Sequence, residues 1–308
     1  MPTISVIICT RNRAASLRLT LAALREVVVP ESSSVELVIA DNGSTDDTRT
    51  ASESFPNPRM TTRYHYEPRK GQAIARNSGV ASSSADIIIF TDDDVRPSPN
   101  WLSAHVQAYD DPKVSAVVGR VKLEFDVPPP HWLNRVHRGL LAEVDRGEAV
   151  ETPHTSHLVG ANMSFRRSVW EKLGGFNTLL GPGRAGFWDD SDFSVRLMQA
   201  GFVQCYLPDA LVHHQIASER LTPEYFRDVA FRSGASAFIA GHIPPDSLPS
   251  TGTFLRSRLR EHRRRAASIF LRKNSVCPES EIFYVMEKGR RWARRQGMKG
   301  LTSHYGGE

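Results

Sequence analysis

A short apolar run that ends in three consecutive carboxylates constrains this chain more than any other feature. Residues 87–90 read Ile-Ile-Ile-Phe, and Asp92, Asp93 and Asp94 follow one residue later. An apolar run of strand length without polar alternation is typical of a strand buried on both faces. Ligands of open α/β sheets bind beyond the carboxyl ends of the strands, so we expect the three acids to stand at a ligand site.

Three neighbouring negative charges at one strand end favour a bound cation. Mg²⁺ and Mn²⁺ are hard ions that take carboxylate oxygens as ligands and commonly bridge to phosphates. The alternative is that the acids only cap the next helix, which the sequence predicts to begin near Ser98 or Pro99. One acid would suffice for a cap, so the run of three favours the cation.

The order of the remaining apolar runs predicts a wound α/β sheet. Predicted strands and helices alternate over the first ~110 residues, which indicates parallel strands joined by right-handed crossovers. The strands are predicted at 4–10, 35–40, 61–66 and 87–90, and the helices at 16–27 and 71–82. Residues 120–157 show no clear periodicity, and two short strands are predicted at 203–207 and 210–212, before a helix at 223–241.

Composition and termini place few restrictions on the protein. A chain of 308 residues with 40% hydrophobic content is ordinary for one large globular domain or two small ones. No window approaches the ~18 apolar residues of a membrane span, and Met1 leads directly into a strand pattern, so we expect a cytoplasmic protein. The three cysteines are far apart, and we expect them to be reduced thiols.

Positive charge is concentrated at the carboxyl end. The net charge is +5, yet residues 256–308 hold 14 Lys or Arg against 5 Asp or Glu. Two helices are predicted here, at 255–271 and 281–295, and the first carries six arginines among apolar residues. Such a helix can lie on an anionic membrane, peripheral to the inner face of the plasma membrane, or pack on the rest of the protein with its arginines in solvent.

Two common nucleotide-binding motifs do not occur in the sequence. No G-x-G-x-x-G follows the first strand, and no G-x-x-x-x-G-K-[ST] occurs anywhere in the chain. A nucleotide in this fold would therefore be held by carboxylates and a metal ion.

Five motifs in order resemble those of family 2 glycosyltransferases with the GT-A fold, a mostly parallel Rossmann-like sheet flanked by helices. They lie at residues 10–13 (TRNR), 41–46 (DNGSTD), 71–79, 92–94 (DDD) and 188–192 (WDDSD). The resemblance runs from about residue 3 to about residue 214. It suggests a catalytic domain over 1–221, with a nucleotide-binding half at 1–119 and an acceptor half at 120–221, followed by a helical basic region at 222–308.

The resemblance implies an inverting transfer of a sugar from a nucleotide-diphosphate donor to an acceptor hydroxyl, with a divalent metal, Mg²⁺ or Mn²⁺, on the diphosphate. The acceptor would be a saccharide or a lipid-linked saccharide in the synthesis of a cell-surface polysaccharide or glycolipid.

Donor and metal roles follow from the resemblance residue by residue. Residues assigned to donor binding are Thr10, Arg11, Asn12, Asp41, Gly43, Arg76, Asn77, Asp92 and Asp93, with Asp41 on the nucleobase and Asp92 on the ribose side. The metal ligands would be Asp94, Asp92 and His214. Three alternatives stay open: Asp41 only initiates the Asn-Gly turn, Arg76 is a solvated helix residue, and His213 and His214 are surface residues at a strand end.

The catalytic base is expected at the start of the helix predicted over residues 188–200. Acids there are favoured by the helix dipole, and Asp192 is spaced to pair with Arg196, so a purely structural reading exists. In the resembled family the second acid of the motif acts as base, which favours Asp190 over Asp189. A carboxylate that deprotonates the acceptor on the face opposite the leaving group gives inversion.

Two other classes of protein fit the sequence less well than a glycosyltransferase does. A non-catalytic module that binds nucleotide sugars or carbohydrates on the same fold would be expected to lose the base or the metal acids, and both are present. A nucleic-acid-binding protein would be expected to show a known module or aromatic platforms, so we expect no nucleic-acid partner.

Overall fold

The computed structural model describes residues 3–31, 33–54, 57, 59–155, 157–241, 277 and 279–296. The helix predicted at 255–271 lies outside these residues, as does most of the basic segment 256–308.

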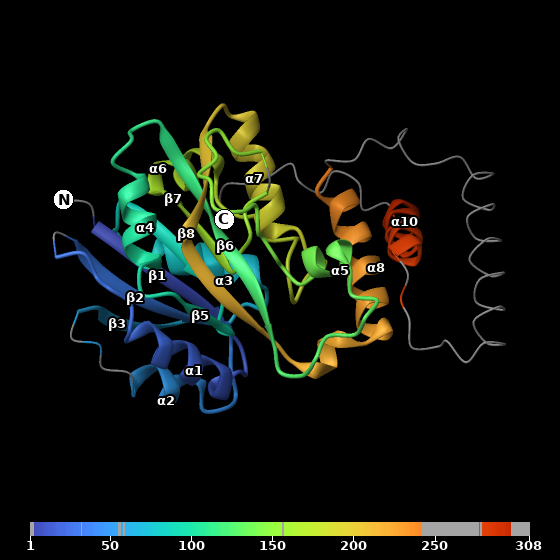
Figure 1. Ribbon diagram of the computed structural model, residues 1–308, viewed down its shortest axis with the longest axis horizontal. Coiled ribbons are helices and arrows are strands. Elements are labelled where there is room, and N and C mark those ends of the chain that lie inside the picture. Colours follow the sequence, from blue (N-terminus) through green and yellow to red (C-terminus); the bar gives the residue numbers. More distant parts are fainter. Residues whose placement is uncertain are drawn as a thin grey trace.

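The described chain folds around one eight-stranded mixed sheet with the strand order β3-β2-β1-β4-β7-β6-β8-β5 (Figure 1). The strands are β1 (Thr3–Thr10), β2 (Ser34–Asp41), β3 (Thr61–Tyr66), β4 (Ile87–Thr91), β5 (Val95–Pro97), β6 (Val114–Phe125), β7 (Asn162–Arg166) and β8 (Val203–Ile216). The predicted α/β class is confirmed.

Strands β1 to β4 form the parallel half that the apolar runs predict. β1 pairs in parallel with β2 on one side and with β4 on the other, and Thr10 lies opposite Asp41 in this register. All five residues of β4 are buried, as expected for a strand covered on both faces. The carboxyl ends of three strands therefore meet at one edge of the sheet.

The second half of the sheet differs from the prediction in two places. β6 continues to Phe125, into the segment predicted to lack regular structure. β8 is one strand of 14 residues instead of two short ones, because the pairing with β6 steps from Leu207 to Leu211 and so carries the strand past Pro208.

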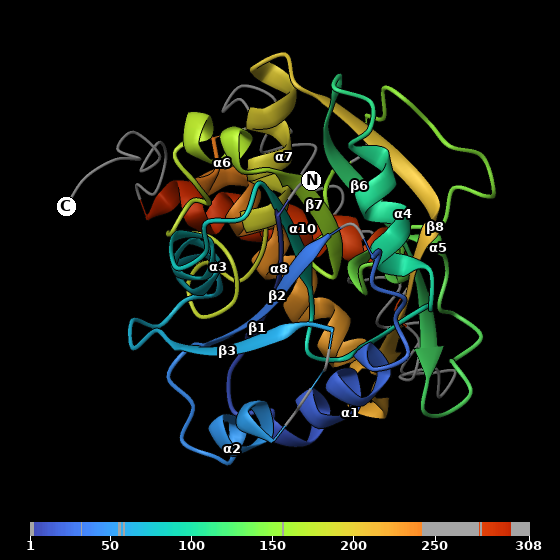
Figure 2. The ribbon, with the colours of Figure 1, turned by 90° about the vertical axis from the view of Figure 1, so that its left-hand side faces the viewer.

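Helices cover both faces of the sheet. Figure 2 shows α1 and α2 on one side of strands β1 to β3, and α3 on the other. The helices are α1 (Ala14–Leu24), α2 (Thr48–Glu53), α3 (Gln72–Ala81), α4 (Trp101–Ala108), α5 (Arg135–Leu140), α6 (Arg167–Leu173), α7 (Asp189–Gln199), α8 (Pro223–Ile239) and α10 (Glu279–Arg295), with a 3-10 turn η1 (Ser218–Leu221).

Helices α8 and α10 lie side by side at one end of the molecule (Figure 1). They approach closely because each has a glycine at the contact: a Cβ on Gly234 would overlap the carbonyl of Met286, and one on Gly289 that of Phe231. Arg227 of α8 donates to Glu281 of α10 at 2.8 Å. Both helices were predicted, at 223–241 and 281–295.

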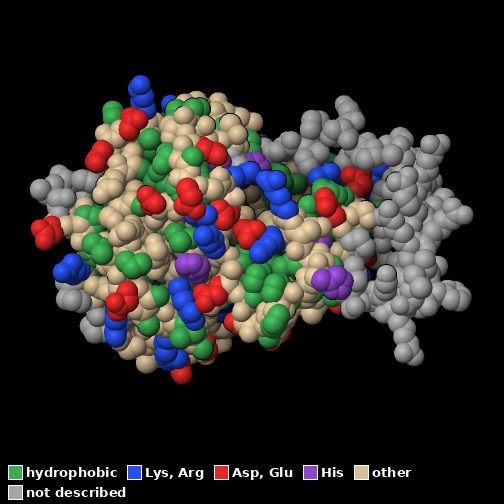
Figure 3. Space-filling model, in the orientation of Figure 1, with side chains coloured by type: hydrophobic (Ala, Val, Ile, Leu, Met, Phe, Trp, Pro, Cys, Tyr) green, Lys and Arg blue, Asp and Glu red, His purple; other side chains and the backbone are tan. Residues whose placement is uncertain are grey.

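Charged side chains of both signs are interspersed over the face seen in Figure 3. None of the helices in the described ranges has the length and apolar content needed to cross a lipid bilayer.

A buried amide fixes the junction between the two halves of the sheet. Asn162 Oδ1 accepts from Trp101 Nε1 at 2.8 Å and from His105 Nε2 at 2.9 Å. Its Nδ2 donates to the carbonyls of Arg120 and Ala210. All four hydrogen bonds of the side chain are satisfied, so the start of β7 is tied to both β6 and β8, and this fixes the position of the loop that precedes β7.

The fully buried His105 makes the stability depend on pH. Burial lowers the pKa of His105 from 6.5 to about 4, against the opposing effect of its bond to Asn162. The unfolded chain therefore binds a proton at this position below pH 6.5 while the folded chain does not, and stability falls as the pH drops from 6.5 to 4. The shift corresponds to about 3 kcal/mol.

We predict that His105→Gln removes this part of the pH dependence. Urea unfolding of wild type and variant between pH 7.5 and 4 measures it, because all other titrating groups are common to both. Equal pH slopes in the two proteins would contradict the assignment.

Candidate active site

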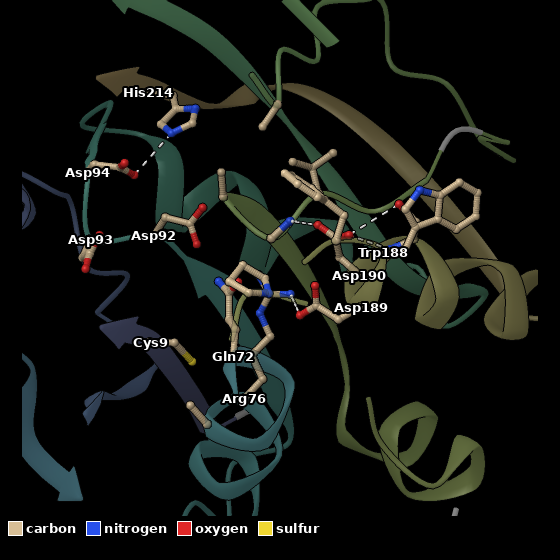
Figure 4. Close-up of a pocket in the computed structure, with 18 of the residues that line it drawn as sticks. Cys9, Gln72, Arg76, Asp92, Asp93, Asp94, Trp188, Asp189, Asp190 and His214 are labelled. Atoms are coloured by element: carbon tan, nitrogen blue, oxygen red, sulfur yellow. Dashed lines mark hydrogen bonds and ion pairs between the residues drawn. The ribbon is translucent and has the colours of Figure 1, made fainter. Parts of the chain in front are cut away.

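A pocket of about 660 Å³ opens at the carboxyl ends of β1 and β4 and at the start of α7. Its lining includes Thr10 and Arg11 from the end of β1, the acids 92–94 that follow β4, and Asp189 and Asp190 of α7. Figure 4 shows Asp94 and His214 at one side of this pocket, Asp92 in the middle, and Asp190 and Trp188 toward the other side. The predicted acidic motifs thus meet in one site.

Asp94 is surrounded by basic side chains. Arg13 Nη2 lies 2.8 Å from its Oδ2, Arg220 Nη1 lies 3.5 Å from the same oxygen, and His214 Nε2 lies 3.3 Å from Oδ1. Burial acts to raise the pKa of Asp94, but the hydrogen bond and charge of His214, with the charges of Arg13 and Arg220, hold that pKa below its ordinary value. Asp94 is therefore a carboxylate at neutral pH.

His214 is oriented by the backbone. Its Nδ1 lies 2.9 Å from the carbonyl oxygen of Leu141, so this nitrogen carries the proton and donates. Metal-binding histidines commonly donate one ring nitrogen to a carbonyl in this way, and the other nitrogen, Nε2, here faces Asp94. The histidine is buried, so the alternative of a surface histidine is wrong for His214.

The two other acids after β4 differ in their surroundings. Asp93 accepts from Thr10 Oγ1 at 2.6 Å and from Arg13 Nε at 2.9 Å, so both of its oxygens are engaged within the protein. Burial raises the pKa of Asp93 to about 7, although Arg13 opposes the shift. Asp92 reaches the centre of the pocket, and burial together with the charge of Asp94 raises its pKa.

Asp189 is locked in a buried ion pair. Arg76 Nη1 lies 2.5 Å from Asp189 Oδ2, and the side chains are only 3% and 5% exposed. Burial raises the pKa of Asp189 to about 6, although the charge of Arg76 opposes the shift. The guanidinium of Arg76 also lies over the rings of Phe90 and Phe176. The alternative of a solvated Arg76 is therefore wrong, and the pair joins α3 to α7.

Asp190 keeps its carboxylate at the pocket surface. Its Oδ2 accepts from the backbone N–H of Gly160 at 2.8 Å, and its Oδ1 accepts from the N–H of Ser191 at 2.7 Å. Only a glycine fits at position 160, because a Cβ there would overlap the guanidinium of Arg76. No basic side chain shares an ion pair with Asp190 in the described part of the chain, so its carboxylate is oriented but not neutralised.

Four residues assigned to donor binding do not line the pocket: Asn12, Asp41, Gly43 and Asn77. Asp41 accepts from the Ser44 N–H at 2.8 Å and from Tyr64 Oη at 2.7 Å, beside the turn that it was predicted to initiate. The side chain of Asn77 bonds the backbone of Phe176 on both its oxygen and its nitrogen. This contact anchors α3, and the sequence did not predict that role for Asn77.

Residues outside the predicted set complete the site. They are Arg13, Arg220, Gly160, Trp188 and Ser233. Arg13 belongs to the first quoted motif, and its position three residues beyond the end of β1 could have predicted that it lies at the pocket. Arg220 and Ser233 come from segments without a motif, and only the packing of η1 and α8 brings them to the pocket.

These features define the class of the protein: it is an α/β protein with an acidic pocket at the carboxyl edge of parallel strands. The sequence profile of Glycosyl transferase family 2 matches residues 5–174, which is more than half of the chain. The chain belongs to this family.

Individual relatives and solved structures agree with the assignment. The chain is 29% identical over 250 residues to the pre-mycofactocin glycosyltransferase of Mycobacterium tuberculosis, which covers 80% of this chain and 49% of that protein. It is 28% identical over 233 residues to the succinoglycan biosynthesis protein ExoM of Rhizobium meliloti, and the match covers 75% of this chain and 72% of that protein. This chain thus spans about half the length of the mycobacterial relative.

The fold is shared with the mannosyltransferase PcManGT from Pyrobaculum calidifontis, solved in complex with GDP-Man and Mn²⁺. The TM-score is 0.62 at 20% identity, over 96% of this chain and 87% of that chain. The predicted GT-A fold is confirmed.

We predict that Asp189→Asn destabilises the protein by ~3–5 kcal/mol, because it leaves Arg76 charged and buried without its partner. Urea unfolding at pH 7.5, where Asp189 is ionised, measures the loss. Asp228→Asn is the matched control, since Asp228 pairs with Arg232 on the exposed side of α8 and its loss should cost less than about 1 kcal/mol. Similar small losses in both variants would contradict the role given to the buried pair.

Proposed function

We propose that this chain is an inverting glycosyltransferase that moves a sugar from a nucleotide-diphosphate donor to the hydroxyl of a saccharide acceptor. The observation that carries the proposal is the shape of the pocket: an acid cluster suited to a metal and diphosphate lies at one side, and the oriented carboxylate of Asp190 lies toward the other. Membership of the family and the relatives' printed activities support it.

The residues near Asp94 fit a divalent metal. No cluster of three or more His, Cys, Asp or Glu within the described ranges is arranged to hold one by itself. Asp94 and His214 nevertheless provide an oxygen and a nitrogen ligand close together, with Asp92 nearby. Divalent ions on phosphate substrates commonly take only one or two protein ligands and complete their shell from phosphate and water. The Mn²⁺ reported with the Pyrobaculum structure supports this choice.

A bound divalent cation would act as a Lewis acid on the diphosphate, where negative charge develops as the nucleotide leaves. Arg13 and Arg220 already flank this position and can pair with phosphate oxygens. Thr10 and Arg11 line the adjacent wall, and we propose that the nucleoside lies there, toward Asp41.

We predict that donor binding requires the metal. Calorimetric titration with UDP, GDP and dTDP, each with Mn²⁺, with Mg²⁺ and with EDTA, should show tight binding of one nucleotide only when a metal is present. Asp94→Asn should weaken the metal-dependent part, and Arg96→Gln serves as a control, because Arg96 pairs at the surface with Glu124. Equal nucleotide affinity in EDTA and in Mn²⁺ would refute the metal site.

Asp190 is the proposed general base. Direct displacement at the anomeric carbon requires the acceptor hydroxyl to lose its proton as it attacks, and a carboxylate within hydrogen-bonding reach can take it. Asp189 is less suited, because Arg76 occupies its Oδ2 and the pair is buried. Asp189 instead serves as a positioning residue for the start of α7.

We predict that Asp190→Asn lowers turnover by roughly a hundredfold or more, the scale expected for loss of a general base. Nucleotide affinity should stay close to wild type, because the asparagine keeps the shape of the side chain and one oxygen that can accept a backbone N–H. Donor turnover and calorimetry measure the two effects. A wild-type protein that binds nucleotide sugars with metal but never turns them over would instead support the alternative of a binding module.

Several finer assignments stay predictions. A lipid-linked acceptor and the division at residue 221 follow from the resemblance, and the cytoplasmic location follows from the hydropathy of the sequence. The succinoglycan biosynthesis protein among the relatives supports a role in polysaccharide synthesis. The proposed contact of residues 256–308 with anionic membrane rests on their charge, and co-sedimentation with anionic vesicles at increasing salt tests it.

A further inference from the structure

The pocket extends beyond the proposed base to a wall that the donor does not account for. Figure 4 shows Trp188 on the far side of Asp190 from Asp94 and His214. Trp188 and Ser233 line this part of the pocket. Both residues lie outside the segment 5–174 that the family profile matches.

The backbone of Trp188 is held in an unfavourable conformation. Its φ of 75° and ψ of 9° lie in the left-handed region, immediately before the first residue of α7. A bulky side chain rarely adopts this conformation, which costs on the order of 1–3 kcal/mol and persists where the surrounding structure enforces it. Such residues cluster at ligand sites, so the outlier beside Asp190 points to a role in binding.

The indole of Trp188 is fixed from three directions. Its Nε1 donates to Ser233 Oγ of α8 at 3.2 Å. The ring of His157 meets it nearly edge-on, with centroids 5.7 Å apart and planes at 68°. The indole also packs against a cluster that includes Leu180 and Phe238. The ring is nevertheless only partly buried, so it presents a rigid apolar surface in the pocket.

We propose that Trp188 is the platform on which a pyranose ring of the acceptor stacks. A pyranose carries C–H groups on its faces and hydroxyls around its rim, and the negative face of an aromatic ring attracts such C–H groups. A sugar lying on the indole would direct its rim toward Asp190, two residues further along the chain. The inference rests on the proposed function and specifies its acceptor as a saccharide that is bound by one ring face.

The test combines ligand-observed NMR with nucleotide titration of the full chain. Saturation-transfer difference spectra are recorded with methyl α-D-mannoside, methyl α-D-glucoside and methyl β-D-galactoside, in the presence of Mn²⁺ and the nucleotide that binds. Trp188→Phe keeps an aromatic face, and Trp188→Leu keeps apolar bulk without one. Trp292→Leu is the matched control, because Trp292 lies on α10 against Phe231 and outside the pocket.

Wild type, Trp188→Phe and Trp292→Leu should all transfer saturation to the C–H groups on one face of the sugar. In Trp188→Leu the affinity for the glycoside should fall roughly three- to tenfold, the loss of one aromatic contact. Nucleotide affinity should be the same in all four proteins. If Trp188→Leu fails to fold, Ser233→Ala takes its place, because it releases the indole and should also weaken glycoside binding.

Three results would overturn the proposal. They are equal glycoside binding by wild type and by the folded variant chosen from Trp188→Leu and Ser233→Ala, no saturation of any glycoside by wild type, and a loss of nucleotide affinity in that variant. The last result would mean that Trp188 stacks on the nucleobase. Nucleotide binding to wild type reports on the donor site separately. A wrong assignment of Trp188 is therefore distinguishable from a wrong proposed function.

Discussion

Five carboxylates share one pocket, and their mutual repulsion is the constraint on which the rest of the site depends. Three of the acids are held by side-chain partners: Asp94 by Arg13, Arg220 and His214, Asp93 by Arg13 and Thr10, and Asp189 by Arg76. Asp92 has a raised pKa at the centre of the cluster. Within the described residues, Asp190 accepts from the backbone N–H groups of Gly160 and Ser191 and from the Ser191 hydroxyl. The proposed base, Asp190, thus differs from the three acids that are paired with side chains.

This difference follows from the fold. Parallel strands β1 and β4 end side by side and deliver Thr10 and the three acids to one edge. The antiparallel strand β7, fixed by Asn162, places Gly160 where its N–H can orient Asp190. The ion pair between Arg76 and Asp189 then sets the start of α7 against α3. Each contact joins segments that are far apart in the chain, so the site exists only in the complete fold.

The sequence predicted the parallel half of the sheet well, because strands buried on both faces must be apolar at nearly every position. It was less informative where a strand is half exposed. The end of β6 alternates Val121, Lys122, Leu123 and Glu124, and this short pattern was not recognised within a proline-containing segment. It also could not decide whether Arg76 is solvated, because burial of a helix face depends on tertiary packing. Trp188 and Ser233 meet only through the packing of α8, which no local pattern specifies.

The central claim is that the base and the leaving group act from opposite faces of the transferred sugar in a single displacement. Proton NMR of donor hydrolysis tests it without a known acceptor, since water can take the acceptor's place. The first anomer released from an α-linked donor such as GDP-mannose or UDP-glucose, whichever the protein uses, is observed before mutarotation. The account predicts that the β-sugar appears first, and initial release of the α-sugar would contradict it.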